Sequence, residues 1–232
     1  MKLDNVNQPM IAEVRTSEKR PANCDWACLV GEKDWEVYHD AIRAVGKTGA
    51  HFLLGGAFGL ASYTGRLRNT KDLDFFVLPW EKDKVVDSLT KAGFEDYYPQ
   101  LAYDRGWIYR ATRDGTIVDT IWQTPNRRTE VDGTWFQRSR TIILRNEALE
   151  IIPAEELLTI KLYVLQRDRC DWPDLLNLLY STVGELDWAH VIHRLGAEEA
   201  LLNGLLHVFN WLAPEQAREI PAEIRARFHL PD

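Results

Sequence analysis

The stretch of sequence that decides the fold reads His51-Phe-Leu-Leu-Gly-Gly-Ala-Phe-Gly-Leu-Ala-Ser-Tyr-Thr-Gly-Arg-Leu-Arg-Asn-Thr-Lys-Asp-Leu-Asp-Phe-Phe-Val77. A short apolar run ends in Gly55-Gly56, a helical pattern over Ala57–Tyr63 stops at Gly65, and a second apolar run follows Asp72-Leu73-Asp74. Apolar runs bounded by glycines are typical of buried strands and turns. We therefore expect a strand, a glycine turn, a short helix and a second strand, in this order.

Two aspartates open the second predicted strand. Side chains alternate along a strand, so Asp72 and Asp74 project from one face with roughly 6.6 Å of rise between them. Phe76 and Leu78 continue that face, and the residues between them line the other. Two adjacent carboxylates cost stability unless a cation offsets them, and Mg²⁺ prefers such oxygen ligands. The spacing indicates a metal site, although an isolated Asp-x-Asp is also compatible with two solvated residues at a strand end.

A third carboxylate strengthens the metal hypothesis. Two alternating runs, Trp107–Arg113 and Thr116–Trp122, flank Asp114-Gly115, a dipeptide typical of a two-residue hairpin turn. Asp119 lies in the middle of the second run, between apolar neighbours, where a lone charge is costly. We therefore expect Asp119 to join Asp72 and Asp74 in one acidic cluster.

The glycine pair upstream adds a second kind of chemistry. Gly55 and Gly56 permit a tight turn and close backbone approach, and the helix that follows offers free N–H groups to phosphate. Two glycines alone usually make only a turn. A glycine turn followed about sixteen residues later by an Asp-x-Asp strand is more specific and indicates a phosphate site beside the acids.

The chain divides into an α/β part and a helical part, with the boundary near Ile152. Residues 1–22 are polar and lack periodicity, so we expect a flexible N-terminal arm. Helical patterns cover Lys33–Val45 and the segment from Pro79 to Gly93, and after Pro153 only helices are expected. The predicted fold class is α+β, with a small mixed sheet flanked by helices in 23–152 and a helical bundle in 153–232. The helices of the bundle are predicted at roughly Ala154–Arg167, Asp171–Val183, Trp188–Leu195, Glu198–Leu212 and Ile220–Phe228.

Composition limits the classes of function. A chain of 232 residues with 45% hydrophobic and 27% charged residues is typical of a globular protein, and no apolar run is long enough to span a membrane. Three cysteines and the absence of an apolar leader favour a reduced, cytoplasmic setting. The net charge of -7 argues against broad adhesion to nucleic acid. A local basic cluster over Arg127–Arg145 could meet phosphates or form an ordinary solvated loop.

Residues 51–77 closely resemble the signature of the DNA polymerase beta-like nucleotidyltransferase superfamily. Within it, Arg68-x-Thr70-Lys71-Asp72-Leu73-Asp74 resembles the subgroup that holds the abortive-infection toxin nucleotidyltransferases and related bacterial proteins. The resemblance continues at Asp119, at Glu155-Glu156-Leu-Leu-Thr-Ile-Lys161 and at Arg167-x-x-x-Asp171-x-x-Asp174, and covers roughly Phe52 to Leu179. One departure is Ala57, where many members place a serine that holds a nucleotide phosphate.

The resemblance implies roles for particular residues. It implies that Asp72, Asp74 and Asp119 are the catalytic carboxylates and the ligands of one or two Mg²⁺ ions. It implies that Gly55, Gly56, Arg68 and Lys161 bind ATP or another NTP. Thr70 is expected to shape the turn before the strand.

Two helical features have a structural interpretation beside the functional one. Lys161 lies on the apolar face of its helix, where its ammonium either reaches water past a buried stem or enters a cleft to meet phosphates; we favour the cleft. Asp171 and Asp174 suit the cap and first turn of a helix. For His190 and His193 we favour one face of an amphipathic helix over a metal site.

The predicted activity is Mg²⁺-dependent transfer of an NMP from an NTP to a hydroxyl acceptor, with release of pyrophosphate. The acceptor stays open between RNA or tRNA, a small hydroxylated molecule of the aminoglycoside or lincosamide kind, and a protein hydroxyl. The resemblance also makes an antitoxin or another protein a candidate partner. The alternative is a catalytically inactive nucleotidyltransferase-fold module that binds nucleotides or proteins, but such a module has no need of three carboxylates.

Overall fold

The computed structural model describes residues 22–68, 70–167 and 169–231, and its strands form one mixed sheet. Their order is β1-β7-β8-β2-β3-β6-β5-β4. The predicted N-terminal arm, residues 1–22, lies outside the described residues except for Ala22, which belongs to β1. The strands are β1 (Ala22–Asn23), β2 (Phe52–Leu54), β3 (Asp72–Val77), β4 (Glu95–Asp96), β5 (Ile108–Arg113), β6 (Thr116–Ile121), β7 (Arg140–Leu144) and β8 (Glu147–Ile151).

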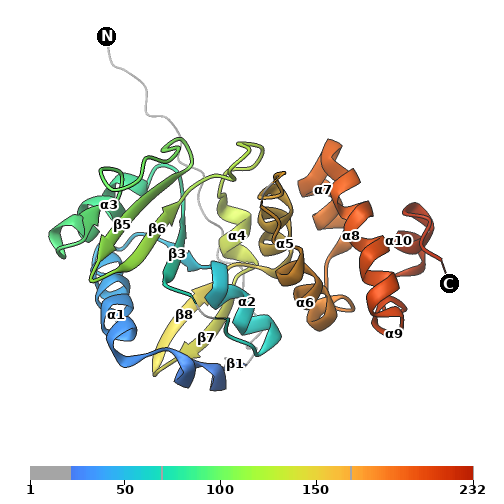
Figure 1. Ribbon diagram of the computed structural model, residues 1–232, viewed down its shortest axis with the longest axis horizontal. Helices are drawn as coiled ribbons and strands as arrows, with labels where there is room; N and C mark the ends of the chain where they lie inside the picture. Colours follow the sequence, from blue (N-terminus) through green and yellow to red (C-terminus); the bar gives the residue numbers. More distant parts are fainter. Residues whose placement is uncertain (1–21, 69, 168, 232) are drawn as a thin grey trace, which may run out of the picture.

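Helices alternate with strands in the first part of the chain, and only helices follow the last strand (Figure 1). The first three alternate with strands, a short fourth precedes β7, and the remainder follow β8 and extend to one side of the sheet. The α+β class with a C-terminal helical bundle is thus confirmed. The helices are α1 (Glu32–Gly46), α2 (Gly56–Thr64), α3 (Lys82–Lys91), α4 (Gly133–Gln137), α5 (Ala154–Tyr163), α6 (Trp172–Thr182), α7 (Trp188–Leu195), α8 (Glu199–Leu212), α9 (Pro214–Ala217) and α10 (Ala222–Arg227).

The two faces of β3 pack into different hydrophobic clusters. Leu73, Phe75 and Val77 join the cluster that holds α1 and α3. Phe76 joins the other, where its ring lies 5.7 Å from that of Trp135 on α4. The alternation predicted for this strand is therefore observed, and Asp72 and Asp74 share the face of Phe76.

The glycine turn joins β2 to α2 and rests directly on β3. The Gly55 N–H donates to the Asp74 carbonyl at 3.0 Å, and Gly56 has a left-handed φ of 51°. A Cβ on Gly56 would lie 1.6 Å from Asp74 Oδ2, and a Cβ on Gly55 would lie 2.1 Å from the Phe76 ring. Both positions therefore exclude a side chain, because the backbone and the face of β3 are already in contact.

Strand register places the third aspartate. β3 and β6 are parallel neighbours with Asp74 opposite Asp119, and β5 and β6 form the predicted hairpin. The turn residues Asp114 and Gly115 have φ values of 54° and 79°, as a two-residue turn of this kind requires. The hairpin thus carries Asp119 to the centre of the sheet.

The helical part shares its core with the sheet. One hydrophobic cluster contains Leu53, Phe76 and Ile121 together with buried residues from α5 to α10. The predicted boundary at residue 152 coincides with the change from strand β8 to helix α5. We propose this point as the division between two units, 23–152 and 153–232, that share one core.

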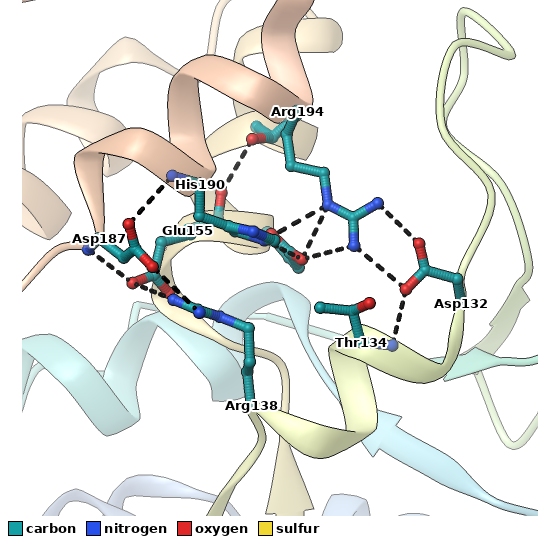
Figure 2. Close-up of polar contacts among 9 residues, drawn as sticks. Asp132, Thr134, Arg138, Glu155, Asp187, His190 and Arg194 are labelled. Carbon is teal, nitrogen blue, oxygen red and sulfur yellow. Dashed lines mark hydrogen bonds and ion pairs between the residues drawn. The ribbon is translucent and has the colours of Figure 1, made fainter. Parts of the chain in front are cut away.

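A buried polar network also ties α7 to the sheet part (Figure 2). Glu156 on α5 is 1% exposed and meets His190 Nε2 at 2.8 Å and Arg194 Nε at 3.1 Å. Arg194 continues to Asp132 at 2.7 Å, and Asp132 accepts from the Thr134 N–H at the start of α4. His190 is thus a hydrogen-bonded residue of an amphipathic helix, as the sequence indicated.

The sheet is larger than predicted, because the β7–β8 hairpin and the two-residue strands β1 and β4 were not foreseen. The turn of the hairpin uses Arg145 and Asn146, which have φ values of 46° and 72°. Only the second of these is a residue type that favours the left-handed region, so the turn signal is weak. Two helices also differ: α3 begins at Lys82 rather than Pro79, and α5 ends at Tyr163 rather than Arg167.

Among the helices that the structure describes, none is both long and apolar enough to cross a membrane.

Changing Gly56 to Ala tests the contact between the turn and β3. The matched control is Gly49→Ala, since Gly49 has a φ of 67° but no atom within 4 Å of an added Cβ. The control should lose about 1–2 kcal/mol of unfolding free energy through backbone strain alone. Gly56→Ala should lose a further ~1–3 kcal/mol through overpacking against Asp74. Urea denaturation measures both, and equal losses would contradict the contact.

Candidate active site

Three carboxylates gather on one face of the sheet at the start of β3. Asp72 and Asp74 occupy alternate positions of this strand, and Asp119 lies opposite Asp74 on β6. Neighbouring strands lie about 4.8 Å apart, so the side chains of Asp74 and Asp119 are adjacent on the sheet. Asp119 is 3% exposed, and Asp74 is partly buried.

The pKa of Asp74 also reflects the closeness of the three carboxylates. Burial, followed by the negative charges of Asp119 and Asp72, raises its pKa to about 7, against the opposing effects of Lys161 and Arg110. Like charges at close range disfavour ionisation of a carboxyl group. A cation beside these acids would relieve the repulsion, so the cluster is electrostatically prepared for one.

Asp119 has a partner that the sequence did not suggest. Arg110 lies opposite it on β5 and donates from Nε to Oδ1 at 2.8 Å and from Nη2 to Oδ2 at 2.7 Å. The hydrogen bonds to Asp119 are the largest cause that raises the pKa of Arg110. Both carboxylate oxygens of Asp119 are therefore engaged by a permanent cation.

The residues suit a divalent ion at Asp72 and Asp74. Carboxylate oxygens are the ligands that Mg²⁺ takes, one or two at a time, with waters completing its coordination. Across residues 22–68, 70–167 and 169–231, no group of three or more His, Cys, Asp or Glu is arranged to hold a metal. Since Arg110 engages Asp119, the fit is to a site with two protein carboxylates.

The elements predicted to bind phosphate lie beside the same acids. Gly56 begins α2, and its backbone contacts the Asp74 carboxylate. The first N–H groups of a helix have no intrahelical partner, so they can donate to an anion. Ala57 is 2% exposed and contributes no hydroxyl there. Backbone donors next to carboxylates can thus hold phosphate that is bridged by a cation.

Lys161 and Arg68 both form ion pairs with acidic side chains. Lys161 is 5% exposed, and its Nζ donates to Asp171 at 3.2 Å and to Asp174 at 2.6 Å. Arg68 reaches Asp174 at 3.3 Å from a half-exposed position. Asp171 precedes α6 without a side-chain cap, so its carboxylate serves Lys161 instead. The charge of Lys161 still opposes the rise in the pKa of Asp74.

A cavity of about 270 Å³ opens beside the loop that precedes Asp72. Its lining includes Tyr38, Phe58, Arg68 and Thr70. The Tyr38 hydroxyl is buried and has no hydrogen-bond partner among the described residues, and burial raises its pKa, as do Asp34, Asp72 and Asp74. The Thr70 hydroxyl accepts from the Asp72 N–H at 3.2 Å, in line with its expected role in the turn. The cavity thus has a cation, Arg68, in its lining near the acids.

The basic residues of 127–145 contact internal partners. Four of the five form ion pairs with acidic side chains, and the guanidinium of Arg140 lies 5.8 Å from the centre of the Tyr63 ring. A guanidinium held in this way is less available to an outside phosphate. The ion pairs are Arg127–Asp104, Arg128–Glu198, Arg138–Glu155, Arg138–Asp187 and Arg145–Glu32.

Comparison with known proteins rests on the fold. No protein-family model matches the sequence, and no curated protein matches it either. An antigenic nucleotidyltransferase-like protein from Paracoccidioides brasiliensis is 16% identical, with 86% of this chain and 99% of that chain covered at a TM-score of 0.52. The antibiotic-resistance factor ANT(2'')-Ia is 12% identical, with coverages of 82% and 100% and a TM-score of 0.49. The lincosamide antibiotic adenylyltransferase LnuA is 16% identical, with coverages of 64% and 96% and a TM-score of 0.45.

The likeness to the Paracoccidioides brasiliensis protein shows that the chain has the nucleotidyltransferase fold. This confirms the fold that the resemblance of residues 51–77 implied. The roles of individual residues stay predictions, which the geometry above makes specific.

The raised pKa of Asp74 predicts a pH-dependent effect of Asp74→Asn. The folded chain holds the Asp74 proton more tightly than the unfolded chain, so this group lowers stability as pH rises from about 4 through about 7. Asparagine removes that cost. In EDTA, Asp74→Asn should therefore gain about 1–3 kcal/mol relative to wild type between pH 5 and pH 8. Urea denaturation at the two pH values measures the gain, and a difference independent of pH would contradict the acidic cluster.

Proposed function

We propose that this protein is a metal-dependent nucleotidyltransferase that moves an NMP from an NTP to a hydroxyl acceptor. The observation that carries the proposal is the contact between the Gly56 backbone and the Asp74 carboxylate. It brings the N-terminus of α2, a donor site for phosphate, against the Asp72–Asp74 pair, a ligand set for Mg²⁺. Phosphate donors and metal ligands, both of which NTP chemistry requires, would therefore lie side by side.

The proposed reaction is an in-line displacement. The acceptor hydroxyl oxygen forms a bond to the α-phosphorus, and the bond from that phosphorus to the oxygen bridging to the β-phosphate breaks. Pyrophosphate leaves with the electron pair, and the hydroxyl proton passes to solvent or to a carboxylate. When bound at Asp72 and Asp74, Mg²⁺ supplies positive charge that offsets the triphosphate.

Residues of the chain have distinct parts in this scheme. Gly56 and the next backbone N–H groups of α2 bind phosphate oxygens. The cavity lined by Tyr38, Arg68 and Thr70 receives part of the donor nucleotide, because its lining combines a guanidinium with aromatic side chains. Lys161 acts at longer range through its charge, since its ammonium is already held by Asp171 and Asp174.

For the acceptor, we propose a small hydroxylated molecule rather than RNA. RNA binding would draw on the basic segment 127–145, whose guanidinium groups already have acidic or aromatic partners within the protein. The net charge of -7 also opposes a polyanionic acceptor. A tRNA acceptor, a protein acceptor and an antitoxin partner stay predictions, as do a preference for ATP and a cytoplasmic location.

Label transfer tests the proposed activity. The protein is incubated with α-labelled NTPs and Mg²⁺ over a panel of RNAs and small hydroxylated molecules. Wild type should label an acceptor, and Asp74→Asn should lower the rate by about 1000-fold or more, because several kcal/mol of charge stabilisation are lost. The control is Asp83→Asn, at a side chain on α3 that is 86% exposed.

Two other outcomes have definite meanings. Equal rates in wild type and Asp74→Asn would remove Asp74 from the site. Absence of both label transfer and Mg²⁺-dependent NTP binding in wild type would favour the inactive module instead.

A further inference from the structure

Arg110, Asp119 and Asp74 form a row across three neighbouring strands. Arg110 on β5 lies opposite Asp119 on β6, and Asp119 lies opposite Asp74 on β3. Directly opposed residues point to the same face of a sheet, with strands about 4.8 Å apart. One permanent cation is thus built into the sheet at the end of the acidic cluster.

The pairing of Arg110 with Asp119 is bidentate and partly buried. The two donor–acceptor distances are 2.8 and 2.7 Å, and the Asp119 side chain is 4% exposed against 28% for Arg110. Planar guanidinium matches both carboxylate oxygens at once, which makes this the strongest common geometry for such a pair. Breaking a buried pair by removing one partner typically leaves the other charge uncompensated at considerable cost.

Neighbouring tyrosines hold Arg110 in place. Its backbone N–H donates to the Tyr103 hydroxyl at 2.8 Å, and its carbonyl accepts from the Tyr97 N–H at 3.0 Å. Its guanidinium carbon lies 5.9 Å and 6.0 Å from the ring centres of Tyr97 and Tyr103. The backbone hydrogen bonds fix the strand at Arg110, and the two aromatic rings lie at the outer range of cation–π contact with its guanidinium.

A second metal ion at Asp119 would conflict with this arrangement. The ion would need the same oxygens that accept from Arg110, and it would bring two cations into contact on the sheet. The two cationic side chains that act on Asp74, Arg110 and Lys161, each have acidic partners of their own. The Asp72–Asp74 end of the cluster therefore lacks a paired cation, whereas the Asp119 end contains the Arg110 guanidinium.

We propose that the Arg110 guanidinium takes the place of a second metal ion, so that the protein binds one divalent cation, at Asp72 and Asp74. Arg110 is a positioning residue that neutralises Asp119 and fixes its carboxylate beside the metal. This inference rests on the proposed function, because it concerns the metal of the same site. It changes the part expected of Asp119, from metal ligand to the anionic partner of Arg110.

To test the proposal, the Mn²⁺ ions that bind to the folded protein in the absence of nucleotide are counted by electron paramagnetic resonance and calorimetry. Wild type should bind one Mn²⁺. Arg110→Gln should bind a second, because it frees both Asp119 oxygens, and Asp119→Asn should still bind one. The matched control is Arg113→Gln on the same strand, where Arg113 pairs with Asp40 at 2.7 Å and faces away from the acids. It should bind one Mn²⁺, and circular dichroism confirms that each variant is folded.

The outcomes separate the two proposals. Two Mn²⁺ on wild type, one of them lost in Asp119→Asn, would overturn the role of Arg110 and leave the metal-dependent function intact. One Mn²⁺ on both wild type and folded Arg110→Gln would also overturn it. If neither wild type nor Arg110→Gln binds Mn²⁺, the metal-dependent function itself fails. Should Arg110→Gln not fold, the Asp119→Asn count still decides, since a lost or weakened site would identify Asp119 as a ligand.

Discussion

The contact between the Gly56 backbone and the Asp74 carboxylate is the constraint on which the rest of the structure depends. No side chain fits at Gly56, and Gly55 is hydrogen-bonded to the Asp74 carbonyl, so the start of α2 is fixed against β3. The helix N-terminus and the carboxylates consequently occupy the same few ångströms. The strain of a left-handed φ at Gly56 is avoided only because glycine has no Cβ. The proposed phosphate site and the proposed metal site both depend on this one local packing requirement.

The negative charges of the acidic cluster are compensated by cations to different degrees. Asp119 has a bidentate arginine, whereas Asp74 is left with a pKa raised to about 7 by burial and by its acidic neighbours. Lys161 contributes from a distance, because Asp171 and Asp174 already hold its ammonium. Because of this difference, an added cation would be stabilised most at Asp72 and Asp74. Buried charge of this kind is costly to fold, and function is a sufficient reason to keep it.

Local patterns in the sequence predicted what depends on local geometry. Alternation placed Asp72 and Asp74 on one face, and Asp114-Gly115 predicted the hairpin that brings Asp119 inward. The same hairpin determines that Arg110 faces Asp119, because the two are equally distant from the turn, so register reasoning could have found the pair. The β7–β8 hairpin was missed because Arg145-Asn146 is a weak turn signal and its arginines suggested a surface patch. The partners of Lys161 lie 10 and 13 residues away, just before and within the first turn of another helix, which no helical periodicity reveals.

Direct observation of the metal is the measurement that tests the central claim most closely. Crystals grown with Mn²⁺, with data collected at the manganese absorption edge, locate the ion through its anomalous scattering. We expect one peak, within coordination distance of carboxylate oxygens from both Asp72 and Asp74, with Asp119 still paired to Arg110. A peak elsewhere, or none at these two residues in crystals that bind Mn²⁺, would contradict it.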